Sequence, residues 1–585
     1  MTDNVNTLLN ENNITAPEKR FLNLSETSNF ASAYLNKPVS VSNISYLLQY
    51  GRIKKYGDKR NILVDVLELI KYYDSLNNFE YKLTTKNPLN LQNITKDEYI
   101  INRSEINENI VKNIDNKNRL GNSDGQRLND FANPLLSFSR YTESERTKHV
   151  HRIHPYKGKF IPQLVEYFLD THVDEFKKET YFKKGDVVLD PFCGSGTTLV
   201  QSNELNLHAV GIEISPFNAL ISNIKIGTHP LSEIRKYISD ITYKFTDFRK
   251  KKNNDFFIEN LNRSLSKFNN KYFPSPEYKI KVREGGINEK EYGGQKEKEF
   301  LVEYERLVKE YKVEIINKYD YSSFNGKWFL RPVKEEIDFI FGEIQKIENS
   351  DVKKVLAAIL SRTMRSCRAT THADLATLKE PIVCPYYCKK HGKICKPLLT
   401  IKDWWKTYSE DTIQRLEEFQ KLKTNTFQLC LCGDSRNLDI YAEVNKKNVL
   451  FYEILKNQKI RGIFSSPPYV GLIDYHEQHA YAYELFGFQK KDEMEIGSLS
   501  KGSGKKAREA YIKDISDVLI NSAKYLQEDY DIFLVANDKY NIYPEIVKLS
   551  GMKIVNRFNR PVLNRVEKDR SNIYSETIFH IKQNK

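Results

Sequence analysis

Two glycines in a short turn between an apolar strand and a helix are the first residues whose types and spacing could do chemistry. In GDVVLDPFCGSGTT the strand ends at Asp190, and Gly194 and Gly196 let the backbone turn tightly and approach a ligand closely. Residues 197–198 begin a helix whose free N–H groups face the turn. A second strand, AVGIEI, ends in Glu213, 23 residues after Asp190. An acid at about 20 residues typically holds ribose hydroxyls, so the segment predicts a site for a ribose-containing ligand.

A stiff segment of four residues follows another short strand. IRGIFS leads into Ser466, Pro467, Pro468 and Tyr469. Two consecutive prolines fix φ and remove two N–H donors, so nearby carbonyls stay free to accept hydrogen bonds. Such acceptors suit an exocyclic amino group. Taken alone, the four residues could also be an ordinary proline-rich turn.

Together the two segments resemble the DNA amino-methyltransferases, in which D-P-F-C-G-S-G-T-T is motif I and S-P-P-Y is motif IV. The resemblance implies S-adenosylmethionine as cofactor, double-stranded DNA as substrate and a base that leaves the duplex before transfer. It also implies that Ser466 and Pro467 hold the amino group by a hydroxyl and a carbonyl, next to Pro468, and that Tyr469 stacks on the base.

The same resemblance assigns the residues that contact the cofactor. HPYKGKF resembles motif X, FQLCLCGDSRNL resembles motif III, and Glu213 takes the ribose. The implied cofactor residues are Asp190, Pro191, Phe192, Gly194, Gly196, Thr197, Thr198, Glu213, Asp434, Tyr156, Lys159 and Phe160.

The serine of S-P-P-Y resembles the enzymes that methylate cytosine at N4, although some adenine-N6 enzymes share it. An RNA base methyltransferase and an inactive DNA-binding subunit are alternatives. RNA enzymes more often carry N-P-P-Y, and the intact motifs argue against an inactive subunit. The expected role is modification in a restriction-modification system, and a separate endonuclease is expected because no nuclease motif is obvious.

Four soft metal ligands lie within twelve residues: Cys384, Cys388, His391 and Cys395. Structural zinc favours four Cys and His ligands, so this segment predicts a zinc site. The C-x3-C-x2-H-x3-C spacing is tighter than common zinc ligand pairs. The alternative is a Tyr-rich basic loop with incidental cysteines, whose lysines could neutralise phosphates.

These residues need a sheet to position them. From about residue 151 strands and helices alternate, which indicates an α/β fold. Strands are expected at Val187–Leu189, Ala209–Ile212, Phe427–Leu431, Gly462–Phe464, Ile532–Val535, Lys553–Phe558 and Thr577–Ile581. We therefore predict a Rossmann-like class I methyltransferase sheet with helices on both faces, interrupted by a large, mainly helical insert.

The predicted domains are a polar tail (1–36), a small helical module (37–75), a linker (76–145), a catalytic domain (146–225 and 426–585) and an insert (226–425). The module resembles the helix-turn-helix of excisionase-like DNA-binding proteins, and an ordinary helical cap is the alternative. Target recognition could lie in the insert or in residues 1–145.

Composition sets the broad class. The chain has 585 residues, 40% hydrophobic and 29% charged, which fits several folded domains rather than disorder. The net charge of +14 is compatible with a polyanionic partner such as nucleic acid, or with an AT-rich genome that favours Lys and Asn. No apolar run approaches the roughly 18 residues of a membrane span, and the N-terminus has no secretory pattern, so the cytoplasm is expected.

Overall fold

The computed structural model describes residues 21–35, 39, 41–49, 53–54, 56–57, 62–70, 72–73, 134–138, 141–156, 158, 160–252, 254–317, 322–372, 380–472, 474–562 and 575–584. Contacts divide the chain into two compact units. The larger comprises 130–259, 307–383 and 397–585, and the smaller comprises 1–129, 260–306 and 384–396.

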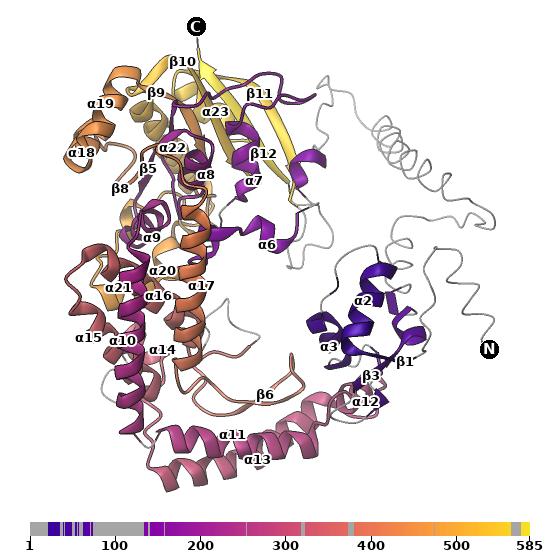
Figure 1. Cartoon of the computed structure of the whole chain (residues 1–585). Coiled ribbons are helices and arrows are strands. Elements are labelled where there is room, and N and C mark those ends of the chain that lie inside the picture. The colour runs from indigo at the N-terminus through magenta and orange to yellow at the C-terminus, as the bar shows by residue number, and fades with distance from the viewer. Residues whose placement is uncertain are drawn as a thin grey trace, which may run out of the picture. The chain divides into compact units, whose positions relative to one another are not determined.

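A seven-stranded sheet forms the centre of the larger unit, in the order β11-β12-β10-β9-β4-β5-β8 (Figure 1). Its strands are β4 (Val187–Asp190), β5 (His208–Glu213), β8 (Gln428–Cys432), β9 (Ile460–Ser465), β10 (Leu526–Ala536), β11 (Met552–Pro561) and β12 (Ser575–Gln583). All seven predicted strands are confirmed. The five strands from β10 to β8 pair in parallel, whereas β12 runs antiparallel to both of its neighbours.

Parallel strands are buried on both faces, and the sequence of this sheet reflects that. Every residue of β4 is buried, and Val187, Leu189, Val210 and Ile463 belong to one large apolar core. The helices that accompany the sheet are α7 (Pro162–Leu169), α8 (Thr197–Glu204), α9 (Pro216–Ile226), α18 (Ile440–Lys447), α19 (Val449–Gln458), α22 (Lys505–Ala523) and α23 (Tyr543–Leu549). This architecture is the predicted Rossmann-like methyltransferase fold.

The chain between β5 and β8 is mainly helical, as predicted. Its helices in the larger unit include α10 (Leu231–Lys250), α14 (Phe324–Trp328), α15 (Arg331–Gln345), α16 (Ser350–Cys367) and α17 (Lys402–Gln420). The buried indole of Trp405 donates to Thr242 at 3.0 Å, which joins α17 to α10. Arg362 of α16 pairs with Asp411 of α17. Side-chain contacts therefore join α17 to both α10 and α16.

The N-terminal part of the smaller unit has its own small core. It contains β1 (Phe21–Asn23), α2 (Leu24–Tyr34), α3 (Val41–Gln49), β2 (Tyr56–Gly57) and β3 (Ile62–Asp65). The strands form an antiparallel sheet in the order β1-β3-β2, and Asn23 begins α2 with a capping box. The helix-turn-helix interpretation stays a prediction, and residues 76–133 of the predicted linker lie outside the described residues.

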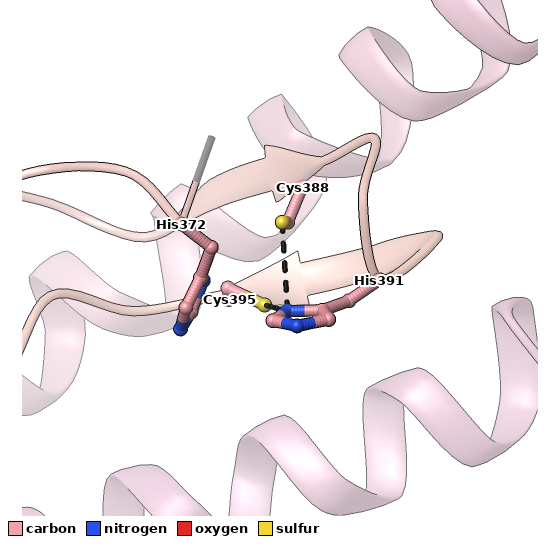
Figure 2. Close-up of side chains that lie close together, drawn as sticks. All are labelled: His372, Cys388, His391 and Cys395. Carbon is pink, nitrogen blue, oxygen red and sulfur yellow. Dashed lines mark hydrogen bonds between the residues drawn. The ribbon is translucent and has the colours of Figure 1, made fainter. Parts of the chain in front are cut away.

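The helices α11 (Asn254–Tyr272), α12 (Glu277–Arg283) and α13 (Glu289–Tyr311) accompany a two-stranded hairpin of β6 (Tyr386–Cys388) and β7 (Lys393–Cys395). Figure 2 shows that Cys388 and Cys395 lie on the two strands and that His391 lies on the turn between them. Among the described residues, no helix is both long and apolar enough for a membrane span.

The larger unit also contains several short helical elements. They are η1 (Pro134–Ser137), α6 (Glu143–Arg146), η2 (His149–Arg152), α20 (Tyr475–Gln478), α21 (Ala480–Phe486), η3 (Asp492–Met494) and η4 (Leu499–Lys501).

Candidate active site

The two motifs meet because the strands that carry them are neighbours. Leu189 of β4 lies opposite Ile463 of β9 in a parallel pair. The carboxyl ends of adjacent parallel strands lie at one edge of the sheet, where ligands bind in open α/β folds. At that edge the Ser465 hydroxyl donates to the Asp190 carboxylate at 2.5 Å. Residues far apart in sequence therefore form one site.

The turn after β4 has the geometry that its glycines predicted. Gly194 has a φ of +53° and Gly196 a φ of +79°, a region that side chains other than glycine rarely adopt. A Cβ on Gly194 would lie 3.0 Å from the Tyr156 ring, and one on Gly196 would lie 3.0 Å from the Ser222 hydroxyl. Both conformation and space therefore require glycine at these positions.

Glu213, at the end of β5, is tied to this turn. Its carboxylate accepts hydrogen bonds from the backbone N–H of Gly194 at 2.7 Å and of Ser215 at 2.9 Å. Burial raises its pKa to about 7, and the hydrogen bonds that favour the charged form only partly oppose this. Burial likewise raises the pKa of Asp190 to about 6, against a hydrogen bond from Ser465.

A pocket with about 570 Å³ of empty space, open solvent included, lies at this edge of the sheet. Its walls are Tyr156, Pro191, Phe192, Ile212, Glu213, Ile214, Asp434, Ser435, Ser466, Pro468, Met494, Glu495 and Ile496. Seven residues predicted to bind cofactor or substrate therefore lie around one space: Tyr156, Pro191, Phe192, Glu213, Asp434, Ser466 and Pro468.

The donor and acceptor groups of this pocket suit S-adenosylmethionine. Glu213 provides a buried carboxylate that can accept from ribose hydroxyls, and the side-chain-free Gly194–Gly196 turn allows close approach. Asp434 is held at the wall by Arg436, which donates to it at 2.6 Å and also pairs with Asp514. Burial opposes the charge on Asp434, but the hydrogen bonds from Arg436 outweigh burial and lower its pKa.

Ser466 presents its oxygen to the pocket in an acceptor role. Its hydroxyl donates to the backbone carbonyl of Val535 on β10 at 2.9 Å. A hydroxyl has one hydrogen and two lone pairs, so this bond leaves the lone pairs for an incoming N–H group. Tyr469 is held separately, since its hydroxyl donates to Glu576 on β12 at 2.9 Å.

Other predicted residues support the site from behind its walls. The Thr198 hydroxyl donates to the carbonyl of Phe464 at 3.3 Å, which joins α8 to β9. Phe160 packs edge-on against Phe464, with ring centroids 5.4 Å apart. Thr197 is buried at the start of α8, and Pro467 is buried at the end of β9. Lys159 lies outside the described residues.

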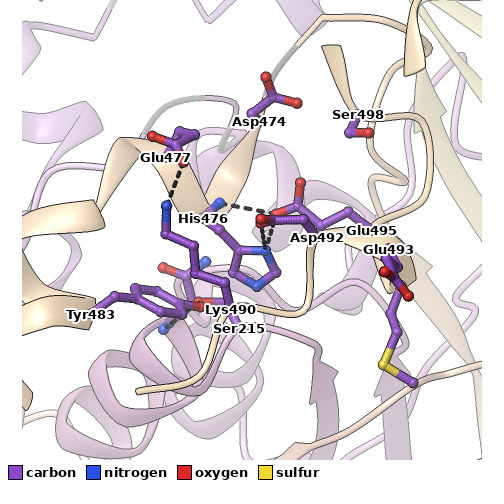
Figure 3. Close-up of polar contacts among 12 residues, drawn as sticks. Ser215, Asp474, His476, Glu477, Tyr483, Lys490, Asp492, Glu493, Glu495 and Ser498 are labelled. Carbon is purple, nitrogen blue, oxygen red and sulfur yellow. Dashed lines mark hydrogen bonds and ion pairs between the residues drawn. The ribbon is translucent and has the colours of Figure 1, made fainter. Parts of the chain in front are cut away.

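Sequence reasoning missed a wall that comes from the chain after S-P-P-Y. Met494, Glu495 and Ile496 line the pocket, although no motif marks them. Figure 3 shows His476 held by carboxylates of this segment: its Nδ1 lies 2.8 Å from Glu495 and 3.0 Å from Asp492. Burial opposes protonation of His476, but these carboxylates raise its pKa overall. An ion pair thus fixes a wall of the pocket.

The same segment is also anchored to the strand that carries Glu213. The hydroxyl of Tyr483 on α21 lies 2.7 Å from that of Ser215, two residues after Glu213 (Figure 3). The wall and Glu213 therefore share a support. The only sequence signal for it was the position of these residues, shortly after motif IV.

The fold is that of a Rossmann-like methyltransferase, and its candidate site is the pocket at the carboxyl edge of the sheet. The model of the DNA methylase family that covers N6 and N4 methyltransferases matches residues 42–223. The type II methyltransferase M.MjaII of Methanocaldococcus jannaschii is 44% identical over 97% of this chain and 98% of its own length. The chain belongs to the amino-methyltransferases of DNA that act at N4 or N6.

Two further relatives match more weakly. The type II methyltransferase M.MvaI of Kocuria varians is 33% identical over 21% of this chain and 25% of its own length. The type II methyltransferase M.BsoBI of Geobacillus stearothermophilus is 21% identical over 75% of this chain and 68% of its own length. Use of S-adenosylmethionine and action on DNA follow from the family.

Proposed function

We propose that the chain transfers a methyl group from S-adenosylmethionine to N4 of a flipped-out cytosine within a specific double-stranded DNA sequence. The proposal rests on the Ser466 hydroxyl, which lines the pocket and donates its hydrogen to the backbone carbonyl of Val535. An exocyclic amino group needs acceptors for its N–H bonds so that its nitrogen lone pair is released from the ring. The Ser466 oxygen and the Pro467 carbonyl are those acceptors in the proposal.

The bound cofactor supplies an electrophilic methyl group on sulfur. The chain's own contribution is to hold the amino nitrogen in line with that methyl, and such positioning can account for much of a rate enhancement. Tyr469 stacks on the base after it leaves the duplex, because the target atom cannot be reached inside the stack. The partly buried hydrogen bond from Tyr469 to Glu576 sets the position of that ring.

Cytosine is favoured over adenine by the serine at the first position of S-P-P-Y. N6-adenine is the second candidate, because serine forms of the motif also occur there. The relatives named as type II methyltransferases support the proposal that the chain is a modification enzyme. A separate endonuclease and a cytoplasmic location stay predictions from the sequence. Methyl transfer by this route needs no metal. The zinc ion predicted for residues 384–395 would therefore have a structural role and no catalytic one.

Labelled S-adenosylmethionine with DNA or tRNA as acceptor tests the proposal. Label in double-stranded DNA is expected, and nucleoside analysis is expected to recover it as N4-methylcytosine. Recovery as N6-methyladenine would overturn the cytosine assignment while leaving the family intact. Label in tRNA alone, or in neither acceptor, would overturn the proposed activity.

A further inference from the structure

The hairpin of β6 and β7 brings three soft metal ligands together within the smaller unit. The Cys388 and Cys395 sulfurs each lie 3.5 Å from Nδ1 of His391, and the ligand atoms of all three lie within 4.8 Å of one another (Figure 2). Both cysteines are thiols rather than a disulfide. Cys384, the fourth residue of the predicted set, is not in this group.

These separations are those of ligands around a tetrahedral ion. Zinc binds thiolate sulfur at about 2.3 Å and imidazole nitrogen at about 2.0–2.1 Å, so tetrahedral angles put the two atoms about 3.5 Å apart. Two sulfurs at that distance from one nitrogen are poorly explained by hydrogen bonding, because a single nitrogen lone pair or N–H serves one partner well. A shared ion explains both distances at once.

The register of the hairpin explains why the cysteines share a face. Tyr386 lies opposite Cys395 and Cys388 lies opposite Lys393, so the two cysteines are diagonal neighbours. Side chains alternate along a strand, and Tyr387 and Ile394, which lie opposite one another, therefore occupy the other face.

That other face is attached to helices of the same unit. The amide of Asn269 on α11 bonds to both the N–H and the carbonyl of Ile394, at 3.0 and 2.9 Å. The hydroxyl of Tyr387 donates to Glu289 at 2.8 Å and lies 2.9 Å from that of Tyr278. Its ring lies so close to Gly293 on α13 that a Cβ there would be at 2.7 Å. The helices thus hold the Tyr387 and Ile394 face of the hairpin in place.

We propose that Cys388, His391 and Cys395 bind a structural zinc ion. Strands of three residues joined by a turn are too short to be stable alone, so a bound ion would fix the hairpin from its second face. Binding releases both thiol protons, and the two thiolates balance the charge of Zn²⁺. The turn presents exposed Lys389 and Lys390, and the ion holds this basic turn in place on the helices.

Metal analysis of the full-length protein tests the site. Wild type purified with zinc and then dialysed is expected to retain about one zinc per chain. Cys388→Ala and Cys395→Ala are each expected to lose at least tenfold in metal content. Cys432→Ala, an exposed cysteine in the larger unit, is the matched control and should retain zinc. Loss of zinc in the control, or equal zinc in all variants, would overturn the proposal.

Cobalt substitution gives a second readout that does not depend on stability. Co²⁺ in the wild type is expected to show the intense visible absorption of a tetrahedral site with thiolate charge transfer, and Cys395→Ala should lose it. Cofactor binding by calorimetry checks that each variant is folded. A cofactor-binding wild type that takes up neither Zn²⁺ nor Co²⁺ after full thiol reduction would also overturn the proposal.

Three ligands leave one position, which a water molecule or another side chain of the chain can fill. Cys384→Ala is expected to keep both the metal and the cobalt spectrum, since its thiol is outside the group. A Cys384→Ala variant without metal would overturn the ligand set.

Discussion

The carboxylate of Glu213 accepts a hydrogen bond from the backbone N–H of Gly194 at 2.7 Å, at the wall of the pocket proposed for the cofactor. The acid proposed to hold the ribose therefore also stabilises the glycine turn. Changes at either residue should affect cofactor binding, and changes in the S-P-P-Y segment should not.

Gly194→Val is expected to weaken S-adenosylmethionine binding by at least about 100-fold. The branched side chain would need a left-handed conformation and would collide with Tyr156, whose ring lies 3.0 Å from the position of a Cβ. Tyr469→Ala should keep the wild-type affinity for cofactor and lose detectable methyl transfer. Calorimetry and a labelled transfer assay measure the two effects. Equal loss of cofactor affinity in both variants would contradict this division of labour.

The affinity for S-adenosylmethionine is expected to fall as pH decreases through about 7. Burial raises the pKa of Glu213 to about 7, and only the ionised form accepts from both ribose hydroxyls. Binding thus favours the ionised form, so affinity is full above that pKa and is lost by up to about tenfold per pH unit below it. Calorimetry from pH 5.5 to 8.5 measures this slope. Glu213→Gln should bind weakly with a flat profile, and a wild-type affinity that rises toward low pH would refute the role.

Ser466→Ala is expected to lower kcat by about 100- to 1,000-fold with little change in cofactor affinity. The variant removes one preorganised acceptor for the target amino group, and single polar groups of this kind typically have effects of that size. Steady-state kinetics on double-stranded DNA measure it. A change confined to KM would indicate that Ser466 binds the substrate without acting on its amino group.

Ser465→Ala should act mainly on stability, in contrast to its neighbour. Its hydroxyl donates to the fully buried Asp190, and the loss of a partner for a buried carboxyl group costs about 1–3 kcal/mol. Denaturant unfolding of the cofactor-free protein measures the change. An unfolding free energy equal to that of the wild type would show that Asp190 finds another partner.

Tyr469→Phe tests whether the hydroxyl bond to Glu576 positions the stacking ring. The phenylalanine ring still stacks, so activity should survive, with a loss of about tenfold that tracks the missing bond. Glu576→Gln keeps an acceptor and should be milder than Tyr469→Phe. Transfer assays compare the three proteins, and the reverse order would place the role of Glu576 elsewhere, for example with Arg560.

The sequence predicted the central strands well because β4, β5 and β9 are short apolar runs that end at an acid or a turn. Val187–Leu189 and Gly462–Phe464 lie inside observed strands, and the mainly helical insert is confirmed. The strand order could not be seen, since β9 pairs with β4 through contacts that no local pattern records. The fold was thus predictable as a list of elements, with the resemblance supplying their arrangement.

The site was predictable where motifs mark it and not elsewhere. Glu213, Asp434 and Ser466 were chosen from sequence, and all three line the pocket. Met494 and Glu495 escaped notice because their position depends on the ion pair with His476, a contact between residues that have no common motif. Cys384 was predicted as a metal ligand because it is near the other ligands in sequence. The register of the hairpin, whose two strands have three residues each, decides which cysteines share a face.

The pairing of β4 with β9 has a consequence for how the protein is made. These strands are central in the sheet, yet one is near residue 190 and the other near residue 460. Closing so long a loop costs conformational entropy of about 5 kcal/mol, and it can only happen after the later strand has left the ribosome. A nascent or truncated chain therefore has a glycine turn but no place for a base. Only chains whose synthesis is nearly finished can therefore methylate DNA, and shorter chains cannot.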